Sequence, residues 1–115
     1  MKLKNIILKN LKKLISLNRE EIDINYYDAM DLMKKNSNII LLDVRSVQEY
    51  NEYHLDGSIN IPKHELISKV EDILEKNNII IIYCQSGIRS KKACKILKGL
   101  GYNNLYNLIG GLDEI

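Results

Sequence analysis

Uninterrupted apolar runs alternate along most of the chain with apolar residues at helical spacing. The runs at 39–42 and 79–83 contain no polar position, which indicates strands buried on both faces inside a sheet. Shorter strands are predicted at 21–24, 58–61 and 104–108, where turn residues bound each run. The pattern therefore predicts five strands, two of them central.

Helically spaced apolar residues occupy the segments between these strands, at 26–35, 66–74 and 90–98. Asn25 is placed to cap the first of these helices, and Ser46 with Glu49 fits a capping box that starts a short helix at 47–51. Because strands alternate with helices, we expect one α/β domain with a mostly parallel sheet covered on both faces.

The longest apolar strand ends at Cys84, and a short loop leads from it into the helix at 90–98. Main-chain N–H groups of such a loop converge and carry partial positive charge, which favours the thiolate form of a cysteine. Arg89, Lys91 and Lys92 oppose the helix dipole at this end, as expected if an anion regularly occupies the loop. The alternative is a buried cysteine at a strand end that has no chemistry.

Length and charge restrict the class of protein. A chain of 115 residues, 45% of them hydrophobic, suits one compact domain. Of the 17 basic residues six precede Glu20, so 11 remain against all 15 acidic residues, and residues 20–115 carry a net charge of −4. A mildly acidic body gives no reason to expect nucleic-acid binding.

The basic N-terminal segment, residues 1–19, is predicted to be an amphipathic helix that precedes a domain at 20–115. Leu3, Ile7 and Leu11 follow helical spacing among lysines. The segment has no apolar run long enough to span a membrane and no cleavage site typical of a signal peptide. Such a helix can lie on a membrane surface or an acidic partner; we favour packing against its own domain or a neighbouring subunit.

The two cysteines, Cys84 and Cys94, are not expected to form a disulfide, because the helix places them too far apart. We expect reduced thiols and a cytoplasmic protein, with Cys94 in the core. His54 and His64 lack neighbours at metal-ligand spacing, so we expect no metal and no cofactor.

Several motifs in a fixed order together resemble the rhodanese family of sulfurtransferases. They cover about residues 22–115, and the positions that carry the resemblance are Leu41-Leu42-Asp43-Val44-Arg45, Glu49-Tyr50, His54 to Pro62, Tyr83 to Ser90, Ala93, Leu97, Gly101-Tyr102, Asn107-Leu108 and Gly110-Gly111. Three positions depart from the family's pattern: Tyr53 replaces a glycine, Ser58 a common alanine and Ile115 a common tryptophan.

The resemblance implies a three-layer α/β/α fold and a two-step sulfur transfer. Cys84 would take the sulfane sulfur of a donor such as thiosulfate, and its persulfide would pass that sulfur to cyanide, a thiol or a protein. The residues implied to bind the substrate are Gln85, Ser86, Gly87, Ile88, Arg89 and, at the rim, Arg45. Arg89 can bind the donor anion or form an ion pair with Asp43 or Glu49, and Arg45 can pair with Glu49.

Three alternatives remain from the sequence. A persulfide carrier or relay module would serve a protein acceptor, with the N-terminal helix for docking. A phosphatase or arsenate reductase is disfavoured, because phosphatases of the same fold have five residues between their cysteine and arginine, whereas four separate Cys84 from Arg89. A non-catalytic binding domain is disfavoured by the intact loop.

Overall fold

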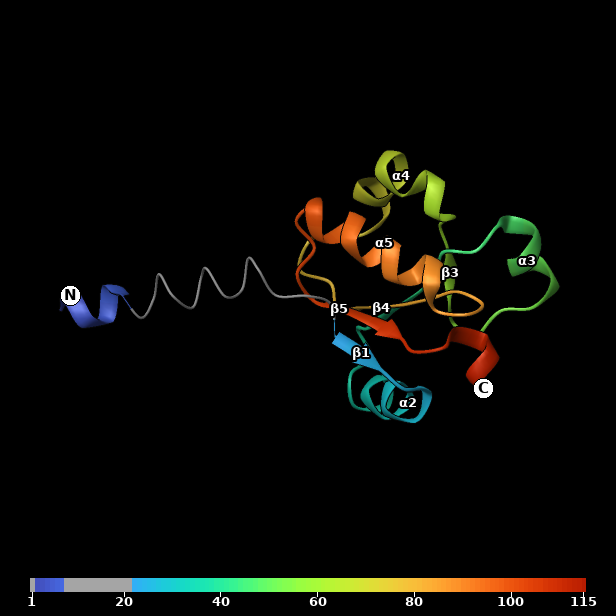
Figure 1. Ribbon diagram of the computed structural model, residues 1–115, viewed down its shortest axis with the longest axis horizontal. Coiled ribbons are helices and arrows are strands. Elements are labelled where there is room, and N and C mark those ends of the chain that lie inside the picture. The colour runs from blue at the N-terminus through green and yellow to red at the C-terminus, as the bar shows by residue number, and fades with distance from the viewer. Residues whose placement is uncertain (1, 8–21) are drawn as a thin grey trace.

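The computed structural model describes residues 2–7 and 22–115, and its centre is a five-stranded sheet in the order β1-β5-β4-β2-β3 (Figure 1). The strands in spatial order are β1 (Ile22–Ile24), β5 (Leu105–Leu108), β4 (Ile80–Tyr83), β2 (Ile40–Asp43) and β3 (Ile59–Asn60). All four pairings are parallel, so the predicted α/β class is confirmed. The two fully apolar runs form the neighbouring central strands β2 and β4.

In residues 22–115 the strands are connected by α2 (Tyr26–Lys35), α3 (Val47–Glu52), the 3-10 turn η1 (Lys63–Glu65), α4 (Leu66–Ile73) and α5 (Ile88–Gly99), and a second 3-10 turn, η2 (Gly111–Glu114), follows β5. The predicted caps are present. Asn25 accepts a hydrogen bond from the Asp28 N–H at 2.8 Å, and Ser46 and Glu49 form both bonds of a capping box. Each such cap contributes about 1 kcal/mol to helix stability.

Helices cover both faces of the sheet, as Figure 1 shows with α4 and α5 on one side and α2 on the other. The side-chain alternation of β4 divides the core accordingly. Ile80 and Ile82 belong to the cluster with α4 and α5, whereas Ile81 and Tyr83 belong to the cluster with α2. This is the three-layer arrangement that the resemblance implied.

The carboxyl ends of the parallel strands meet at one edge of the sheet, where Asp43 of β2 pairs in register with Tyr83 of β4. Asn107 of β5 lies beside Ile82, one residue before that end. Because the loops after β2, β4 and β5 all leave from this edge, distant segments of the chain come together there.

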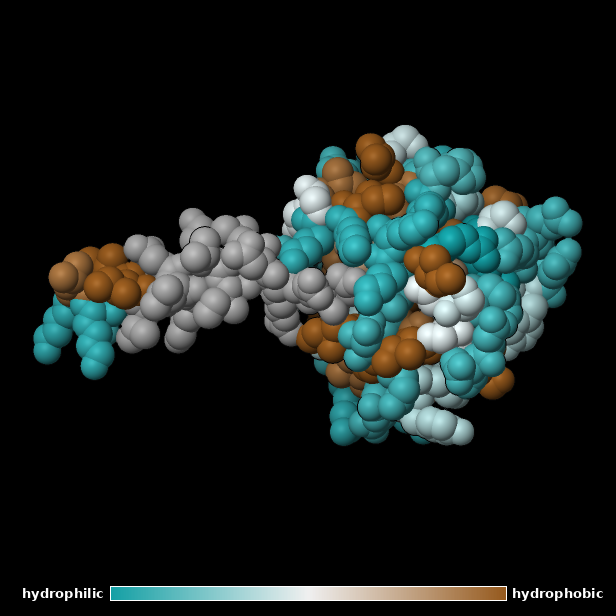
Figure 2. Space-filling model, viewed as in Figure 1, coloured by the Kyte–Doolittle hydropathy of each residue, from teal (hydrophilic) through white to brown (hydrophobic). Residues whose placement is uncertain are grey.

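The N-terminal prediction lies mostly outside the described residues. Residues 3–7 are helical, with Leu3, Ile6 and Ile7 exposed, and Figure 2 shows hydrophobic and hydrophilic side chains on opposite sides of this turn. Residues 8–21 and the predicted boundary at 19/20 fall outside the described part. Within that part, no helix has the length and hydropathy that crossing a membrane requires.

Candidate active site

The loop after β4 wraps around the sulfur of Cys84. The main-chain N–H groups of Gly87 and Ser90 donate hydrogen bonds to Cys84 Sγ, at N···S distances of 3.1 and 3.3 Å. Gly87 has a φ of 95°, and this left-handed turn starts α5 at Ile88, two residues before the predicted start. The loop therefore aims two amide dipoles and a helix N-terminus at one sulfur atom.

Opposing effects act on the pKa of Cys84. Burial disfavours the thiolate and raises the pKa, whereas hydrogen bonds from the Ser90 side chain, the Ser90 N–H and the N–H groups of Gly87 and Ser86 lower it. The hydrogen bonds outweigh burial, so the pKa lies below the ordinary value for a thiol. A larger fraction of nucleophilic thiolate at neutral pH follows.

A chain of side chains behind the sulfur extends to the edge strand β1. Ser90 Oγ lies 3.4 Å from Cys84 Sγ and 2.6 Å from Asn107 Oδ1, and the Asn107 amide donates to Asp23 Oδ1 at 3.2 Å. The Ser90 hydroxyl has one proton, so it can donate to Asn107 beside a neutral thiol and turn to the sulfur once the thiolate forms.

Loop residues cover the sulfur from solvent. Cys84 has an exposed fraction of 0%, whereas Gln85, Ser86 and Ile88 are exposed. Reaction at Sγ requires these residues to move aside or the outer atom of a persulfide to emerge between them.

The C-terminal turn η2 holds the start of the loop in place. Leu112 N–H donates to Cys84 O at 3.1 Å and Asp113 N–H donates to Gln85 O at 2.9 Å, while the Gln85 side chain donates to Asp113 Oδ1 at 2.7 Å. Gly111 makes this approach possible, because a Cβ there would lie 2.3 Å from Cys84 O.

Arg45 lies near the loop in a buried ion pair with Asp43. Its guanidinium donates to both carboxylate oxygens of Asp43, at 2.7 to 3.1 Å, and to the Tyr53 carbonyl at 2.5 Å. Burial lowers the pKa of Arg45, but the hydrogen bond and charge of Asp43 outweigh it and the net shift is upward. Arg45 thus pairs with Asp43 rather than with Glu49, the partner that the sequence allowed, because its side chain turns back to its own strand.

Arg89 forms a bidentate ion pair with Glu49 of α3, at 2.7 and 2.9 Å. Of the two ion-pair partners predicted for Arg89, Glu49 is the one observed. The hydrogen bond from Arg89 holds the pKa of Glu49 at about 2, and the same contact raises the pKa of Arg89. The pair connects α3 to the first turn of α5.

Ser58 and Tyr83 connect the end of β4 to the segment before β3. The Ser58 and Tyr83 hydroxyls lie 2.9 Å apart, and Ser58 also donates to Leu55 O at 2.7 Å. Burial raises the pKa of Tyr83 to about 12, so the phenol stays neutral and hydrogen-bonded. Alanine, common at position 58 in the family, could form neither bond.

Two hollows flank the loop. One, of about 400 Å³, is lined by Arg45, Glu49, Glu52, Tyr53, Gln85 and Leu112. The other, of about 410 Å³, is bounded by Ser86, Gly87 and Ile88 of the loop, by lysines of α5 and by residues of β1 and β5. Of the site residues that the sequence predicted, Arg45 and Gln85 line the first hollow and Ser86, Gly87 and Ile88 line the second, whereas Cys84 and Arg89 line neither.

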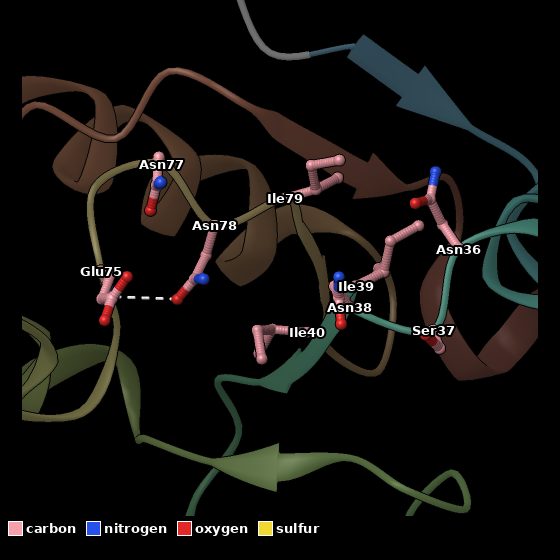
Figure 3. A pocket seen from close by; sticks show the side chains of 9 residues that line it. All are labelled: Asn36, Ser37, Asn38, Ile39, Ile40, Glu75, Asn77, Asn78 and Ile79. Atoms are coloured by element: carbon pink, nitrogen blue, oxygen red, sulfur yellow. Dashed lines mark hydrogen bonds between the residues drawn. The ribbon is translucent and has the colours of Figure 1, made fainter.

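A third hollow, of about 580 Å³, lies at the amino ends of β2 and β4, away from Cys84 (Figure 3). Its polar lining consists mainly of amides such as Asn36, Asn38 and Asn77, and Asn78 Oδ1 accepts from the Glu75 N–H at 2.8 Å. Neither cysteine lines it. Over the described ranges 2–7 and 22–115, no three His, Cys, Asp or Glu residues cluster as metal ligands.

The sequence profile of the rhodanese-like domain matches residues 26–115, which is most of the chain. The chain belongs to the rhodanese-like domain family. Solved structures agree. A rhodanese-related protein from Thermoplasma volcanium is 33% identical with a TM-score of 0.65, covering 82% of this chain and 87% of its own. A rhodanese-like domain from Anabaena sp. is 25% identical with a TM-score of 0.75, covering 82% and 72%.

Relatives with assigned names differ in how much of their length this rhodanese-like chain spans. Thiosulfate sulfurtransferase PspE of Escherichia coli is 36% identical, over 64% of this chain and 71% of the relative. The tRNA uridine(34) hydroxylase of Buchnera aphidicola is 38% identical over 76% of this chain, and the putative sulfur carrier protein YrkF of Bacillus subtilis is 34% identical over 64%. The chain spans only 30% and 40% of those two proteins.

Sequence reasoning missed three functional neighbours of Cys84. Ser90 was placed in the helix but not against the sulfur, and Asn107 was assigned to a strand and to a family motif without a contact to the site. Gly110-Gly111 signalled a turn. Nothing in that local signal indicated that the turn contacts the loop after β4, where the N–H groups of Leu112 and Asp113 donate to Cys84 O and Gln85 O.

Proposed function

We propose that this rhodanese-like chain is a sulfurtransferase that carries sulfane sulfur, from thiosulfate or a similar donor, to a nucleophilic acceptor as a persulfide on Cys84. The observation that carries the proposal is the pair of loop amides, Gly87 and Ser90, that donate to Cys84 Sγ. Such donors stabilise a sulfur anion before and after it gains a second sulfur atom.

In the first step, Cys84 thiolate attacks the outer sulfur of thiosulfate. A new S–S bond forms on Cys84, the S–S bond of thiosulfate breaks, and its electron pair leaves with sulfite. In the second step, an acceptor thiol or cyanide attacks the outer sulfur of the persulfide. That S–S bond then breaks and its electron pair returns to Cys84 as thiolate.

The two arginines near the loop have different roles in this proposal. The guanidinium of Arg89 donates two hydrogen bonds to the carboxylate of Glu49. Arg89 therefore positions the start of α5 and adds positive potential at the sulfur. Arg45 is neutralised by Asp43 and shapes the wall beside Gln85, where a donor anion would enter. Neither Cys84 nor Cys94 is in a disulfide, which supports our proposal that the protein works in the reducing cytoplasm.

The test is intact-mass analysis after incubation with thiosulfate and removal of excess donor. We expect the wild-type protein to gain one sulfur atom, Cys84→Ser to gain none and Cys94→Ala to gain one like the wild type. A wild-type protein that gains no sulfur from thiosulfate or from an organic polysulfide would contradict the proposal.

A persulfide carrier is the second candidate, and the burial of Cys84 favours it. A sulfur that loop residues cover is poorly exposed to small acceptors, whereas a docked protein can displace the cover. The two candidates differ in the second step. A sulfurtransferase for small molecules discharges its persulfide rapidly to cyanide, whereas a carrier retains it until a protein thiol is supplied.

A further inference from the structure

The hollow on the β5 side of the loop is a groove with a basic wall. Ser86, Gly87 and Ile88 of the active-site loop bound it at one end, and Lys91, Lys92 and Lys95 line it along α5. The face seen in Figure 2 shows hydrophilic side chains along α5 with hydrophobic patches between them. A docked molecule in this groove would touch the loop that covers the sulfur.

The three lysines of the groove form no ion pair with any residue in 2–7 or 22–115, and all three are exposed. Among the other lysines of residues 22–115, Lys35, Lys69 and Lys76 each pair with a carboxylate, whereas Lys34, Lys63 and Lys98 do not. The groove differs in that three such lysines line one hollow. Lys91 and Lys92 also lie near the amino end of α5, where a cation opposes the helix dipole by a few tenths of a kcal/mol. Helix stability therefore does not explain these charges.

Apolar side chains also line the groove. Ile88 is 64% exposed and Ile109 is 48% exposed, and both line the groove. The carboxylate in the lining, Asp23, already accepts a hydrogen bond from Asn107. Exposed isoleucines beside unpaired lysines suit a protein surface better than a small anion, because an anion gains nothing from the apolar contact.

The spacing of the lysines fits an extended acidic segment. Lys91 and Lys95 are one helical turn apart, about 6 Å along the axis. Carboxylates at every second position of an extended peptide are about 6.6 Å apart. Residues 20–115 as a whole have a net charge of −4 and repel an acidic partner. The basic groove is the local exception, and it would orient such a partner.

The groove also connects to the sulfur through the interior. Asp23 and Asn107 line it, and Asn107 accepts from Ser90, which contacts Cys84 Sγ. An occupant that moves Ile88 or Asn107 therefore acts on the sulfur's own hydrogen bonds.

We propose that this groove docks the sulfur acceptor, a protein segment whose thiol is flanked by aspartate or glutamate residues. The inference rests on the proposed function and names its partner class. The acceptor thiol attacks the outer sulfur of the Cys84 persulfide, the S–S bond on Cys84 breaks, and Cys84 leaves as thiolate. The acceptor retains the transferred sulfur as its own persulfide, and no external oxidant or reductant is consumed.

Two synthetic peptides test the charge preference. Both carry one central cysteine; the acidic peptide has glutamate at every second position, and the neutral peptide has glutamine instead. Full-length protein is loaded with thiosulfate, and mass spectrometry follows the rate of sulfur transfer to each peptide. We expect the wild-type protein to transfer at least about tenfold faster to the acidic peptide, and this ratio to shrink between about 0.05 M and about 0.5 M NaCl.

Charge reversal on α5 locates the effect. In the triple variant Lys91→Glu, Lys92→Glu, Lys95→Glu we expect the acidic-to-neutral ratio to fall to about one or below. Glutamate near the start of α5 complements the helix dipole, so the variant should keep its fold, which circular dichroism verifies. Lys98→Glu on the same helix does not line the groove and is expected to keep the wild-type ratio. The N-terminal cations are identical in all the proteins compared.

A binding measurement separates this inference from the proposed function. Acidic peptide with serine in place of cysteine should bind Cys84→Ser protein, and the triple charge reversal should abolish that binding. The docking proposal alone is overturned if the wild-type protein loads sulfur but transfers it equally fast to the acidic and neutral peptides. It is also overturned if the preference for the acidic peptide persists in the triple variant. Binding that depends on the lysines without any sulfur loading overturns the sulfurtransferase proposal, and the inferred transfer step with it.

Discussion

At the residue scale, the chemistry of Cys84 depends on a balance between burial and hydrogen bonds. A thiol with no exposed surface would ordinarily resist ionisation. Each hydrogen bond to a charged group contributes about 1.5–3 kcal/mol. The bonds from Ser90, Gly87 and Ser86 together outweigh the desolvation and lower the pKa of Cys84. The reactivity of the thiol is therefore a property of its neighbours.

Ser90→Ala should make Cys84 less reactive. The variant loses the hydroxyl that can donate to the sulfur but retains the Ser90-position N–H, so the pKa of Cys84 rises and the thiolate fraction at pH 7 falls. We expect alkylation of Cys84 by iodoacetamide to slow by about threefold to tenfold at pH 7. Mass spectrometry of the Cys84 peptide across a pH series measures it.

Ser86→Ala is the matched control, since position 86 acts through its backbone and its side chain is exposed. Its alkylation profile should coincide with the wild-type profile. Equal profiles for Ser90→Ala and the wild type would mean that the hydroxyl stays with Asn107 in both ionisation states.

At the scale of elements, the loop around Cys84 depends on a turn that follows a different strand. Two main-chain N–H groups of η2 donate to the carbonyl oxygens of Cys84 and Gln85, and a Cβ on Gly111 would lie within 3 Å of both oxygens. The geometry of the loop is thus set from two sides, by the start of α5 and by η2.

Gly111→Ala should damage both stability and sulfur loading. Its Cβ would lie 2.3 Å from Cys84 O and 2.7 Å from Gln85 O, so the loop or the turn must shift. We expect a loss of about 2–4 kcal/mol in the free energy of unfolding and a severalfold slower gain of sulfur from thiosulfate. Urea denaturation and intact-mass analysis measure these two effects.

Gly57→Ala separates the steric effect from backbone strain. Gly57 also has a positive φ, of 79°, but a Cβ there meets nothing within 4 Å. The free energy of unfolding of Gly57→Ala should fall by only about 1–2 kcal/mol, because alanine is strained in the left-handed conformation. The variant should load sulfur at the wild-type rate. Equal losses of loading in the two glycine variants would exclude a specific role for the η2 contact.

At the scale of the whole molecule, ion pairs near the site connect segments that the sheet alone does not join. Arg89 and Glu49 lie 40 positions apart in the chain and bind through two hydrogen bonds, with side chains 38% and 32% exposed. A pair with this exposure contributes about 1 kcal/mol at most, because solvent screens the charges. Its contribution to stability also depends on pH.

Glu49→Gln should be destabilising at neutral pH and neutral in acid. The folded-state pKa of Glu49, about 2, lies below its ordinary value of 4.5. A depressed pKa contributes stability above the unfolded value that is lost as pH falls from about 4.5 toward about 2. Glutamine keeps the capping box, so the difference between variant and wild type, about 0.5–1 kcal/mol at pH 7, should vanish near pH 2.

Urea denaturation at a series of pH values makes this measurement. The control is Glu65→Gln, which breaks a surface ion pair with Lys69. Its free energy of unfolding should fall by less than about 0.5 kcal/mol at pH 7. A Glu49→Gln deficit that stays constant down to pH 2 would mean that the carboxylate's charge does not stabilise the fold.

The sequence by itself determined the features that depend on neighbouring residues. Apolar runs without polar positions marked β2 and β4 as central strands, and the capping box of Ser46 and Glu49 was recognisable from four consecutive positions. The position of Cys84 at the carboxyl end of a central strand followed from the same pattern. Short-range periodicity and local caps are encoded within a few residues, so they can be read without a fold.

Only the tertiary structure decided which distant groups meet. It paired Arg89 with Glu49 and turned Arg45 onto Asp43, a choice between carboxylates that sequence spacing left open. It also brought Ser90, Asn107 and Gly111 to the sulfur and its loop. The physical reason is that parallel strands, separate in sequence, end at one edge of the sheet, and side-chain direction there depends on packing rather than on any local pattern.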